Sequence, residues 1–431
     1  MEKLYKFPLK MHIGKPAKAI VEVGDVIKRG ECIANEDGLG AKIHSSVNGV
    51  VRKITKNLIE IKADEIQSSE FVKIKECDSL IDYVIEAGVV GAGGAGFPTH
   101  VKLQAKIPKG YIIANCVECE PALKHNVYLI ENYPQLVIKG IEYAMEATGA
   151  QRAYIAIKGK NKRAIEVLKK TLKNNKIEIK ELRDMYPMGE ERAIIHEIFG
   201  IWLRPDQLPL DANCVVLNGE TLANITRAVD ERKPVIDKDL TIIGKLKSGN
   251  KPNVELQVPV GTSFKSLIEK YGGIDGEYGE VIIGGPYTGN AQNINSSWVT
   301  KTSGGAIVTI PLPKFEDNMG LLVCACGNDE ERLRDVAKKM GANVVGVTKC
   351  KNLEVIRGVN KCKTPGHCPG QVQGIIYLKN LGAKRVLISN CSDCSNTVMC
   401  CAPKMSIPVY HHTDHVFRTI DHTLTRRLPM E

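Results

Sequence analysis

The chain has 431 residues, of which 43% are hydrophobic and 25% charged, values typical of a soluble protein with several domains. No apolar run is long enough to span a membrane, and the first residues lack the apolar segment of a signal peptide, so we expect a cytoplasmic protein. The net charge of +10 does not predict nucleic-acid binding, because only 5% of the residues are aromatic and no basic run alternates with them.

Four domains are expected from the order of the predicted elements. Residues 1–75 form short strands separated by glycine-containing turns, and residues 76–238 alternate helix with strand. Residues 239–317 combine short strands with one helix, a pattern that suits a small β-grasp module. Residues 318–431 form a second α/β unit, which contains most of the cysteines.

The second domain has the clearest periodicity. Residues 80–87 are predicted to be helical, as are residues 134–148, whose apolar spacing stops at Gly149. Strands are predicted at 153–157 and 177–182. The alternation predicts an α/β domain with a parallel sheet.

Nine of the fourteen cysteines lie in the last domain, where they follow the ends of predicted strands at 320–323, 343–347 and 385–389. The carboxyl ends of parallel strands line one crevice, so these thiols are expected to converge there. The nine are Cys324, Cys326, Cys350, Cys362, Cys368, Cys391, Cys394, Cys400 and Cys401. Clustered CxC and CxxC spacings favour metal or redox chemistry over structural disulfides.

Three kinds of site fit these thiols. They could hold an iron–sulfur cluster, or four of them could close a structural zinc site. Alternatively, Cys324 and Cys326 could cycle between dithiol and disulfide, because residues 328–331 resemble a helix start and a helix N-terminus lowers the pKa of a nearby thiol.

The remaining cysteines and histidines are predicted to have ordinary roles. Cys32, Cys77 and Cys214 are expected to be core or surface residues, and Cys116 and Cys119 to be small buried packing residues. The histidines near the end, which accompany Asp414, are more typical of solvated polar residues than of metal ligands. They are His411, His412, His415 and His422.

A glycine-rich segment, Gly91-Ala-Gly93-Gly94-Ala-Gly96, matches the pattern G-x-G-x-x-G. The predicted helix at 80–87 precedes it, whereas a dinucleotide fingerprint follows a strand. Glycines allow backbone amides to approach a phosphate closely, so we expect an amide-lined phosphate loop. A turn between two helices that requires small residues is the alternative.

Four sequence blocks, in this order, resemble the flavin-binding signature of one family. The blocks are GVVGAGGAGFPTHVKL (88–103), NCVECEP (115–121), YPMGEE (186–191) and LNGETLAN (217–224). The family comprises the NADH-oxidising subunit of respiratory complex I and the C subunit of the Rnf electron-transport complex. The resemblance implies an α/β multidomain fold: an N-terminal barrel-sandwich hybrid domain, an FMN-binding α/β domain, a β-grasp (SLBB-like) module and a C-terminal cysteine-rich Rossmann-like α/β domain.

The resemblance also implies an FMN site and a nucleotide site. Gly91, Gly93 and Gly94 would offer amides to the FMN phosphate and Lys102 a counter-charge, while Asn115, Glu118, Gly189, Glu190 and Asn218 would line the ribityl chain and the isoalloxazine. Phe97, Glu120 and Glu191 would face a nicotinamide nucleotide. Val117 stands where complex I subunits have an acidic residue, so the blocks imply FMN more directly than NADH.

The tail departs from the Rnf subunit, because it has no ferredoxin-like CxxCxxC run. CACGNDEERL (324–333) and CKTPGHCPGQ (362–371) resemble the proline reductase-associated electron transfer proteins. This implies an oxidoreductase that passes electrons from NADH through FMN and the cysteine site to a partner reductase, D-proline reductase. The alternatives are a peripheral NADH-oxidising subunit of a membrane Rnf-type complex and a zinc-stabilised scaffold without flavin.

Overall fold

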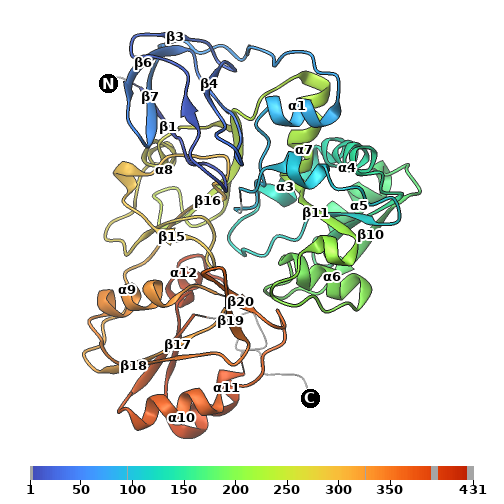
Figure 1. The fold of residues 1–431 in the computed structure, drawn as a ribbon. Helices are drawn as coiled ribbons and strands as arrows, with labels where there is room; N and C mark the ends of the chain where they lie inside the picture. Colours follow the sequence, from blue (N-terminus) through green and yellow to red (C-terminus); the bar gives the residue numbers. More distant parts are fainter. Residues whose placement is uncertain (1–2, 95, 326, 390–396, 425–431) are drawn as a thin grey trace.

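The computed structural model describes residues 3–94, 96–325, 327–389 and 397–424. In Figure 1 the N-terminal strands (blue) lie at the top, the α/β region that follows (cyan to green) on the right, and the cysteine-rich region (orange to red) at the bottom. Residues of the third predicted domain (yellow) lie between the first and the last.

Short strands separated by turns, as predicted, form two small antiparallel sheets between residues 4 and 63. Phe7, Ile33, Ile59 and Ile61 are fully buried between them. The sheet orders are β1-β7-β6-β3 (Leu4–Pro8, Leu58–Ala63, Gly49–Ile54, Val26–Ile27) and β2-β4-β5 (Lys18–Ala19, Cys32–Asn35, Ile43–His44).

The next region is a four-stranded parallel sheet of order β10-β9-β8-β11, with helices on both faces. Alternate residues of β8 point to opposite faces: Ile112 and Ala114 are in the core cluster with α4, whereas Ile113 is in the cluster with α6. The strands are β8 Tyr111–Asn115, β9 Arg152–Lys158, β10 Ile177–Leu182 and β11 Cys214–Asn218. The helices are α1 Leu80–Glu86, α2 Thr99–Leu103, α3 His125–Asn132, α4 Pro134–Thr148, α5 Lys162–Thr171, α6 Glu191–Phe199 and α7 Gly219–Thr226.

The helix and strand predictions for this region are confirmed. In particular, α4 ends at Gly149 in the left-handed conformation, with φ 76°, as the glycine predicts. Three short helical turns also lie among the described residues up to 300: η1 Pro209–Ala212, η2 Arg227–Glu231 and η3 Ile294–Ser296.

The third region is a mixed five-stranded sheet of order β13-β12-β16-β14-β15, with Phe264 and Ile268 of α8 buried against it. Its elements are β12 Asp237–Gly244, β13 Asn253–Pro259, α8 Phe264–Lys270, β14 Val281–Ile283, β15 Asn290–Ala291 and β16 Gly305–Val308. The strand β12 crosses the boundary predicted at 238/239. Its polar first residues are buried because ion pairs, such as Lys238 with Glu220, satisfy their charges.

The last region is a four-stranded parallel sheet of order β18-β17-β21-β22. The strands are β17 Asn318–Val323, β18 Asn343–Lys349, β21 Arg385–Ile388 and β22 Val409–His411, and the helices are α9 Glu330–Met340, α10 Val372–Asn380, α11 Val398–Cys401 and α12 Asp414–Thr419. A hairpin of β19 Leu353–Ile356 and β20 Val359–Cys362, which the sequence patterns did not predict, follows β18, and a short turn, η4 Pro403–Met405, follows α11. In the part of the chain that the structure describes, no helix is both long and apolar enough to cross a membrane.

The prediction that the histidines near the end are solvated is wrong for three of them. His411, His412 and His415 are at most 2% exposed, and Asp414 is 1% exposed. The reason is tertiary: His415 Nε2 lies 3.0 Å from Glu280 Oε2, and His412 Nε2 lies 3.3 Å from the carbonyl oxygen of Tyr287. These partners precede the histidines by more than a hundred residues, so local composition could not reveal them.

Candidate functional site

The candidate cofactor site lies at the carboxyl edge of the β10-β9-β8-β11 sheet (Figure 1). In chain order the strands run 3-2-1-4, so the winding direction reverses between β8 and β11. Ligands of open parallel sheets bind outside this reversal point. Asn115 and Asn218, the last residues of β8 and β11, pair in register there. The two predicted asparagines therefore meet at the expected crevice.

The glycine loop is held beside the first turn of α7. Its ends are closed by hydrogen bonds from Gly91 N to Phe97 O (2.9 Å) and from Gly96 N to Gly91 O (3.0 Å). Ala92 N donates to Thr221 Oγ1 at 2.9 Å, which ties the loop to α7. Thr221 was not among the predicted site residues, although it lies inside the fourth sequence block.

The loop is shaped to receive a phosphate. Gly94 has φ +100°, and a Cβ added there would meet no atom within 4 Å, so this backbone faces open space. A Cβ at Gly93 would lie 3.2 Å from the side-chain amide nitrogen of Asn218. Both glycines are exposed next to the start of a helix, where backbone amides and the helix dipole favour an anion. The predicted residues therefore fit the phosphate of FMN.

The third block packs directly against the second. Asn115 Nδ2 donates to Gly189 O at 2.9 Å, and a Cβ at Gly189 would lie 2.7 Å from Cys119 Sγ and 3.1 Å from Val117 O. Only glycine allows this approach. Glu190 is the N-cap of α6. Its carboxylate accepts hydrogen bonds from the amides of residues 192 and 193 and from the Arg192 side chain.

Glu118 is a partly buried carboxyl at this edge. It accepts hydrogen bonds from Asn126 Nδ2 (2.9 Å) and Glu120 N (3.2 Å). Burial raises the pKa of Glu118 to about 7, although the hydrogen bond from Asn126 opposes the shift. The group can therefore exchange a proton near neutral pH.

The predicted phosphate counter-charge and one predicted nucleotide residue are partners of each other. Lys102 Nζ lies 2.7 Å from Glu191 Oε1 and donates to Val216 O at 2.9 Å. Phe97 is half-buried and closes the glycine loop through its carbonyl oxygen. The structure thus brings Lys102 and Glu191 together, which the blocks alone did not predict.

Glu120, also predicted to face a nucleotide, holds a loop of the five-stranded region. Its carboxylate accepts hydrogen bonds from Tyr287 N (2.8 Å), Thr288 N (3.1 Å) and Thr288 Oγ1 (2.7 Å). A Cβ at Gly285 would overlap the Glu120 carboxyl, so this contact requires glycine. Burial raises the pKa of Glu120, and the two amides oppose the shift. Tyr287 and Thr288 were not among the predicted residues, and only the fold brings them here.

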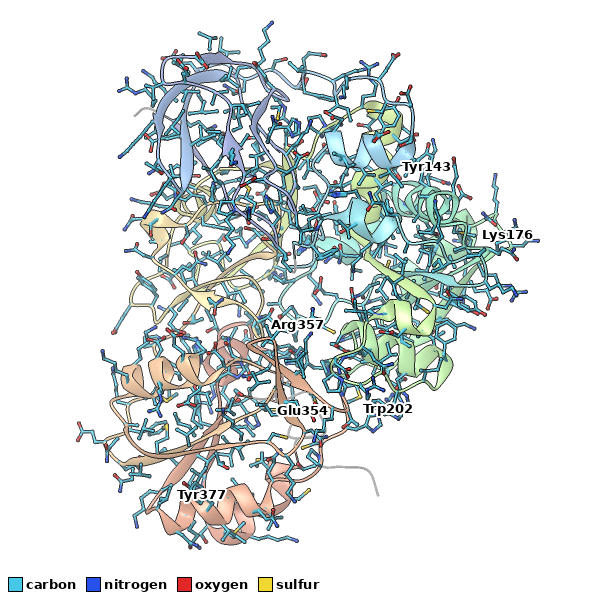
Figure 2. The ribbon with its side chains drawn as sticks, viewed as in Figure 1. Tyr143, Lys176, Trp202, Glu354, Arg357 and Tyr377 are labelled. Carbon is cyan, nitrogen blue, oxygen red and sulfur yellow. The ribbon has the colours of Figure 1, made fainter. Side chains whose placement is uncertain are left out.

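Aromatic side chains connect the cysteine-rich region with the region of the β10-β9-β8-β11 sheet, directly and through Tyr287 of the five-stranded region. Tyr287 packs edge-on against Tyr186 at 4.2 Å and against Phe417 of α12 at 5.5 Å between ring centroids. At a second contact, His367 lies edge-on to Trp202, at 5.1 Å. Figure 2 shows Trp202 on the border that faces the β19–β20 hairpin, which carries Glu354 and Arg357.

Six of the nine predicted cysteines lie among the described residues, whereas Cys326, Cys391 and Cys394 lie outside them. Cys324 and Cys350 directly follow β17 and β18, as predicted, and α9 begins after Asp329, which caps it. Gln371 Nε2 lies 3.3 Å from Cys350 Sγ and 3.5 Å from Cys368 Sγ. Within the described ranges, no three His, Cys, Asp or Glu side chains are grouped so that they could hold a metal ion.

The other cysteines differ in their surroundings. Cys362 is buried in β20, and Cys401 donates to Val398 O at 3.4 Å on α11, next to the half-buried Cys400. Cys116 is buried, as predicted, and burial raises its pKa to about 12. Cys119 is half-buried and contacts the amide of Gly189.

Comparisons with known proteins agree with this geometry. Residues 84–227 match the family described as the Nuo51 FMN-binding domain, and residues 1–76 match the RnfC barrel sandwich hybrid domain. The fold and the site therefore define a flavin-linked electron-transfer oxidoreductase.

Relatives extend the match. The C subunit of the Na⁺-translocating ferredoxin:NAD⁺ oxidoreductase complex of Acetobacterium woodii is 30% identical over 320 residues, which cover 70% of this chain and 72% of the relative. Its counterpart in the proton-translocating complex of Clostridium ljungdahlii is 31% identical, over 70% of this chain and 69% of the relative. The chain belongs to the RnfC family, the C subunits of the Rnf ferredoxin:NAD⁺ oxidoreductase complexes.

Two further similarities are partial. The cobalamin reductase PduS of Salmonella typhimurium is 40% identical over 237 residues, which cover 55% of this chain and 50% of that relative. An NAD⁺-reducing [NiFe]-hydrogenase structure shares 21% identity over 54% of this chain and 46% of its own, with a TM-score of 0.47.

Proposed function

We propose that this protein passes electrons from NADH through FMN to the cysteine site of its last domain, and from there to a partner reductase. The observation that carries the proposal is the convergence of the glycine loop, Asn115 and Asn218 at the reversal point of one parallel sheet. We further propose a cytoplasmic protein with domains at 1–75, 76–238, 239–317 and 318–431.

The chain's own residues have separate tasks in this proposal. The amides of Gly93 and Gly94 bind the phosphate, while Asn115 orders the segment around Gly189 on one side of the crevice. Glu118 holds or releases a proton next to the ring, since its pKa is about 7. When bound, FMN supplies two-electron redox chemistry, and the protein supplies position and electrostatics.

The partner reductase is proposed to be D-proline reductase, on the likeness of the blocks at 324–333 and 362–371. A second candidate is a peripheral subunit of a membrane Rnf-type complex, which the similarity over 70% of the chain to an Acetobacterium woodii protein favours. The lack of a CxxCxxC run distinguishes the tail from the Rnf pattern. A flavin-free zinc scaffold is disfavoured, because the glycine loop keeps open space at Gly94.

The FMN site is tested by Gly94→Asp. We expect this variant to lose FMN binding, because a carboxylate would enter the space predicted for the phosphate. Gly94→Asn is the matched control: it has the same size and tolerates positive φ better than most residues, so it should retain measurable affinity. Flavin fluorescence titration measures both. Wild-type protein without affinity for FMN, or equal binding by both variants, would contradict the assignment.

The donor is tested by mixing NADH with the FMN-loaded protein in a stopped-flow spectrometer. We expect the flavin absorbance to bleach within the time of one turnover. Phe97→Ala should slow bleaching by NADH but not by dithionite, which needs no nucleotide site. Slow reduction by NADH together with fast reduction by a ferredoxin or flavodoxin would exclude NADH as the donor.

A further inference from the structure

Two cysteines of the last domain occupy facing positions at the ends of neighbouring strands. Val323 of β17 pairs in parallel register with Lys349 of β18, so Cys324 and Cys350 are the next residues on each strand. The strands remain joined here, because Cys350 N donates to Val323 O at 2.9 Å. Neighbouring strands lie about 4.8 Å apart. That spacing falls inside the Cα separation of about 4.4–6.8 Å that a disulfide requires.

The two thiols also contact each other. A hydrogen bond between the Cys324 and Cys350 side chains, followed by burial, raises the pKa of Cys350. The pair is held in place from both sides: Gln371 Nε2 donates to Cys350 Sγ at 3.3 Å, and the Ser389 hydroxyl accepts from Cys324 N at 2.7 Å. Both cysteines are buried, at 6–7% exposed, and the Gln371 amide that contacts Cys350 also lies 3.5 Å from Cys368 Sγ.

A ligand-binding position and a cavity lie next to the pair. In chain order this sheet runs 2-1-3-4, so the winding direction reverses between β17 and β21, and Cys324 at the end of β17 borders this reversal point, where ligands of open parallel sheets bind. A cavity of about 160 Å³ is lined by Lys349 and Lys351, the sequence neighbours of Cys350, and by Gln371. Gln371 therefore contacts both the cavity and the thiol, and the lysines favour an anionic electron acceptor or an acidic partner surface.

We propose that Cys324 and Cys350 form a redox-active dithiol–disulfide pair that carries two electrons through the last domain. On oxidation, the two S–H bonds break, one S–S bond forms, and two electrons and two protons leave. A low-molecular-weight disulfide such as oxidised glutathione accepts them, because its own S–S bond breaks to give two thiols. The role of this pair between flavin and partner reductase rests on the proposed function, whereas the thiol chemistry itself does not.

The test uses the full-length protein, equilibrated anaerobically in glutathione buffers of graded ratio, then alkylated and digested with trypsin. Lys349 and Lys351 flank Cys350, whereas Cys324 lies in a peptide of residues 315–332, so a link between them is visible by mass spectrometry. We expect one such link, formed reversibly and removed by dithiothreitol. It should be lost in Cys324→Ser and in Cys350→Ser.

Two control variants make the result specific. Cys326→Ser should retain the link, and so should Cys214→Ser, a buried cysteine at the start of β11. A link within residues 315–332 that disappears in Cys326→Ser would overturn the proposal in favour of the CxC pair. Stoichiometric iron or zinc that protects Cys324 and Cys350 from alkylation until chelated would overturn it in favour of a metal site.

Flavin binding is measured on the same samples, which separates this proposal from the proposed function. Protein that binds FMN and forms no Cys324–Cys350 link contradicts only the dithiol. Protein that forms the link and binds no FMN contradicts only the flavin function.

Discussion

Glu280→Gln is expected to destabilise the contact between the five-stranded region and the last domain by about 3–5 kcal/mol. Glu280 is 4% exposed and lies directly before β14. Its carboxylate contacts Arg332 of α9 at 2.6 and 2.8 Å, His415 Nε2 of α12 at 3.0 Å and Lys339 Nζ at 2.6 Å. Removing the charge leaves the Arg332 guanidinium buried, and among the described residues its remaining acidic partner is the half-exposed Asp335.

The electrostatics explain why the effect should be large. Burial alone would raise the pKa of Glu280, but the hydrogen bonds from Arg332 and His415 outweigh it and hold the pKa well below its usual range. The carboxylate is therefore ionised at every pH at which the protein is handled. Removing one partner of a buried ion pair lowers the free energy of unfolding by more than the intact pair contributes to it, because the remaining charge stays buried without solvation.

The measurement is hydrogen exchange of the amides in α9 and β14. A loss of about 3 kcal/mol corresponds to exchange that is faster by about 100-fold. Glu330→Gln is the matched control, because Glu330 pairs with Arg334 on the exposed side of the same helix, where a surface pair contributes about 0.5 kcal/mol. Equal effects of the two substitutions would show that the Glu280 network does not hold these regions together.

Glu118→Gln is expected to stabilise the protein at pH 8 and to have little effect at pH 4.5. The pKa of Glu118 in the fold, about 7, exceeds its ordinary value of 4.5, so the folded state binds more protons than the unfolded state between these values. Stability therefore falls as pH rises from about 4.5 to about 7. The full pKa shift corresponds to about 3 kcal/mol in the free energy of unfolding. Because Glu118 is only partly buried, we expect Glu118→Gln to raise this free energy by about 2 kcal/mol at pH 8.

The geometry accommodates an amide in place of the Glu118 carboxyl. Asn126 Oδ1 is a buried atom that makes no hydrogen bond among the described residues, so the Asn126 amide can turn and accept from the introduced side-chain amide. Urea denaturation at pH 5 and pH 8 measures the change. Glu181→Gln should behave oppositely, because hydrogen bonds from Lys162 lower the pKa of this exposed carboxyl and replacement can only reduce stability at pH 8. A pH-independent effect of Glu118→Gln would contradict the raised pKa.

The sequence by itself determined the features that depend on local periodicity and on glycine. The apolar spacing of 134–148 and the following Gly149 predict a helix and its end, because a left-handed residue without a Cβ stops the hydrogen-bond ladder at little cost. The strands at 177–182 and 343–347 were also predicted locally, because their β-branched and apolar residues form short runs typical of strands. The family resemblance of the four ordered blocks also assigned Asn115 and Asn218 to one site, and the two residues pair in register at the ends of β8 and β11.

Only the tertiary structure decided which polar groups face each other. The partner of Glu120 is a loop 167 residues away, the partner of His415 is Glu280, and Lys102 pairs with Glu191; no local pattern records such contacts. The same holds for the thiols. Close spacing in sequence pointed to Cys324 and Cys326, of which Cys326 lies outside the described residues. The parallel register also places Cys324 beside Cys350, a neighbour that their separation of 26 residues in sequence does not suggest.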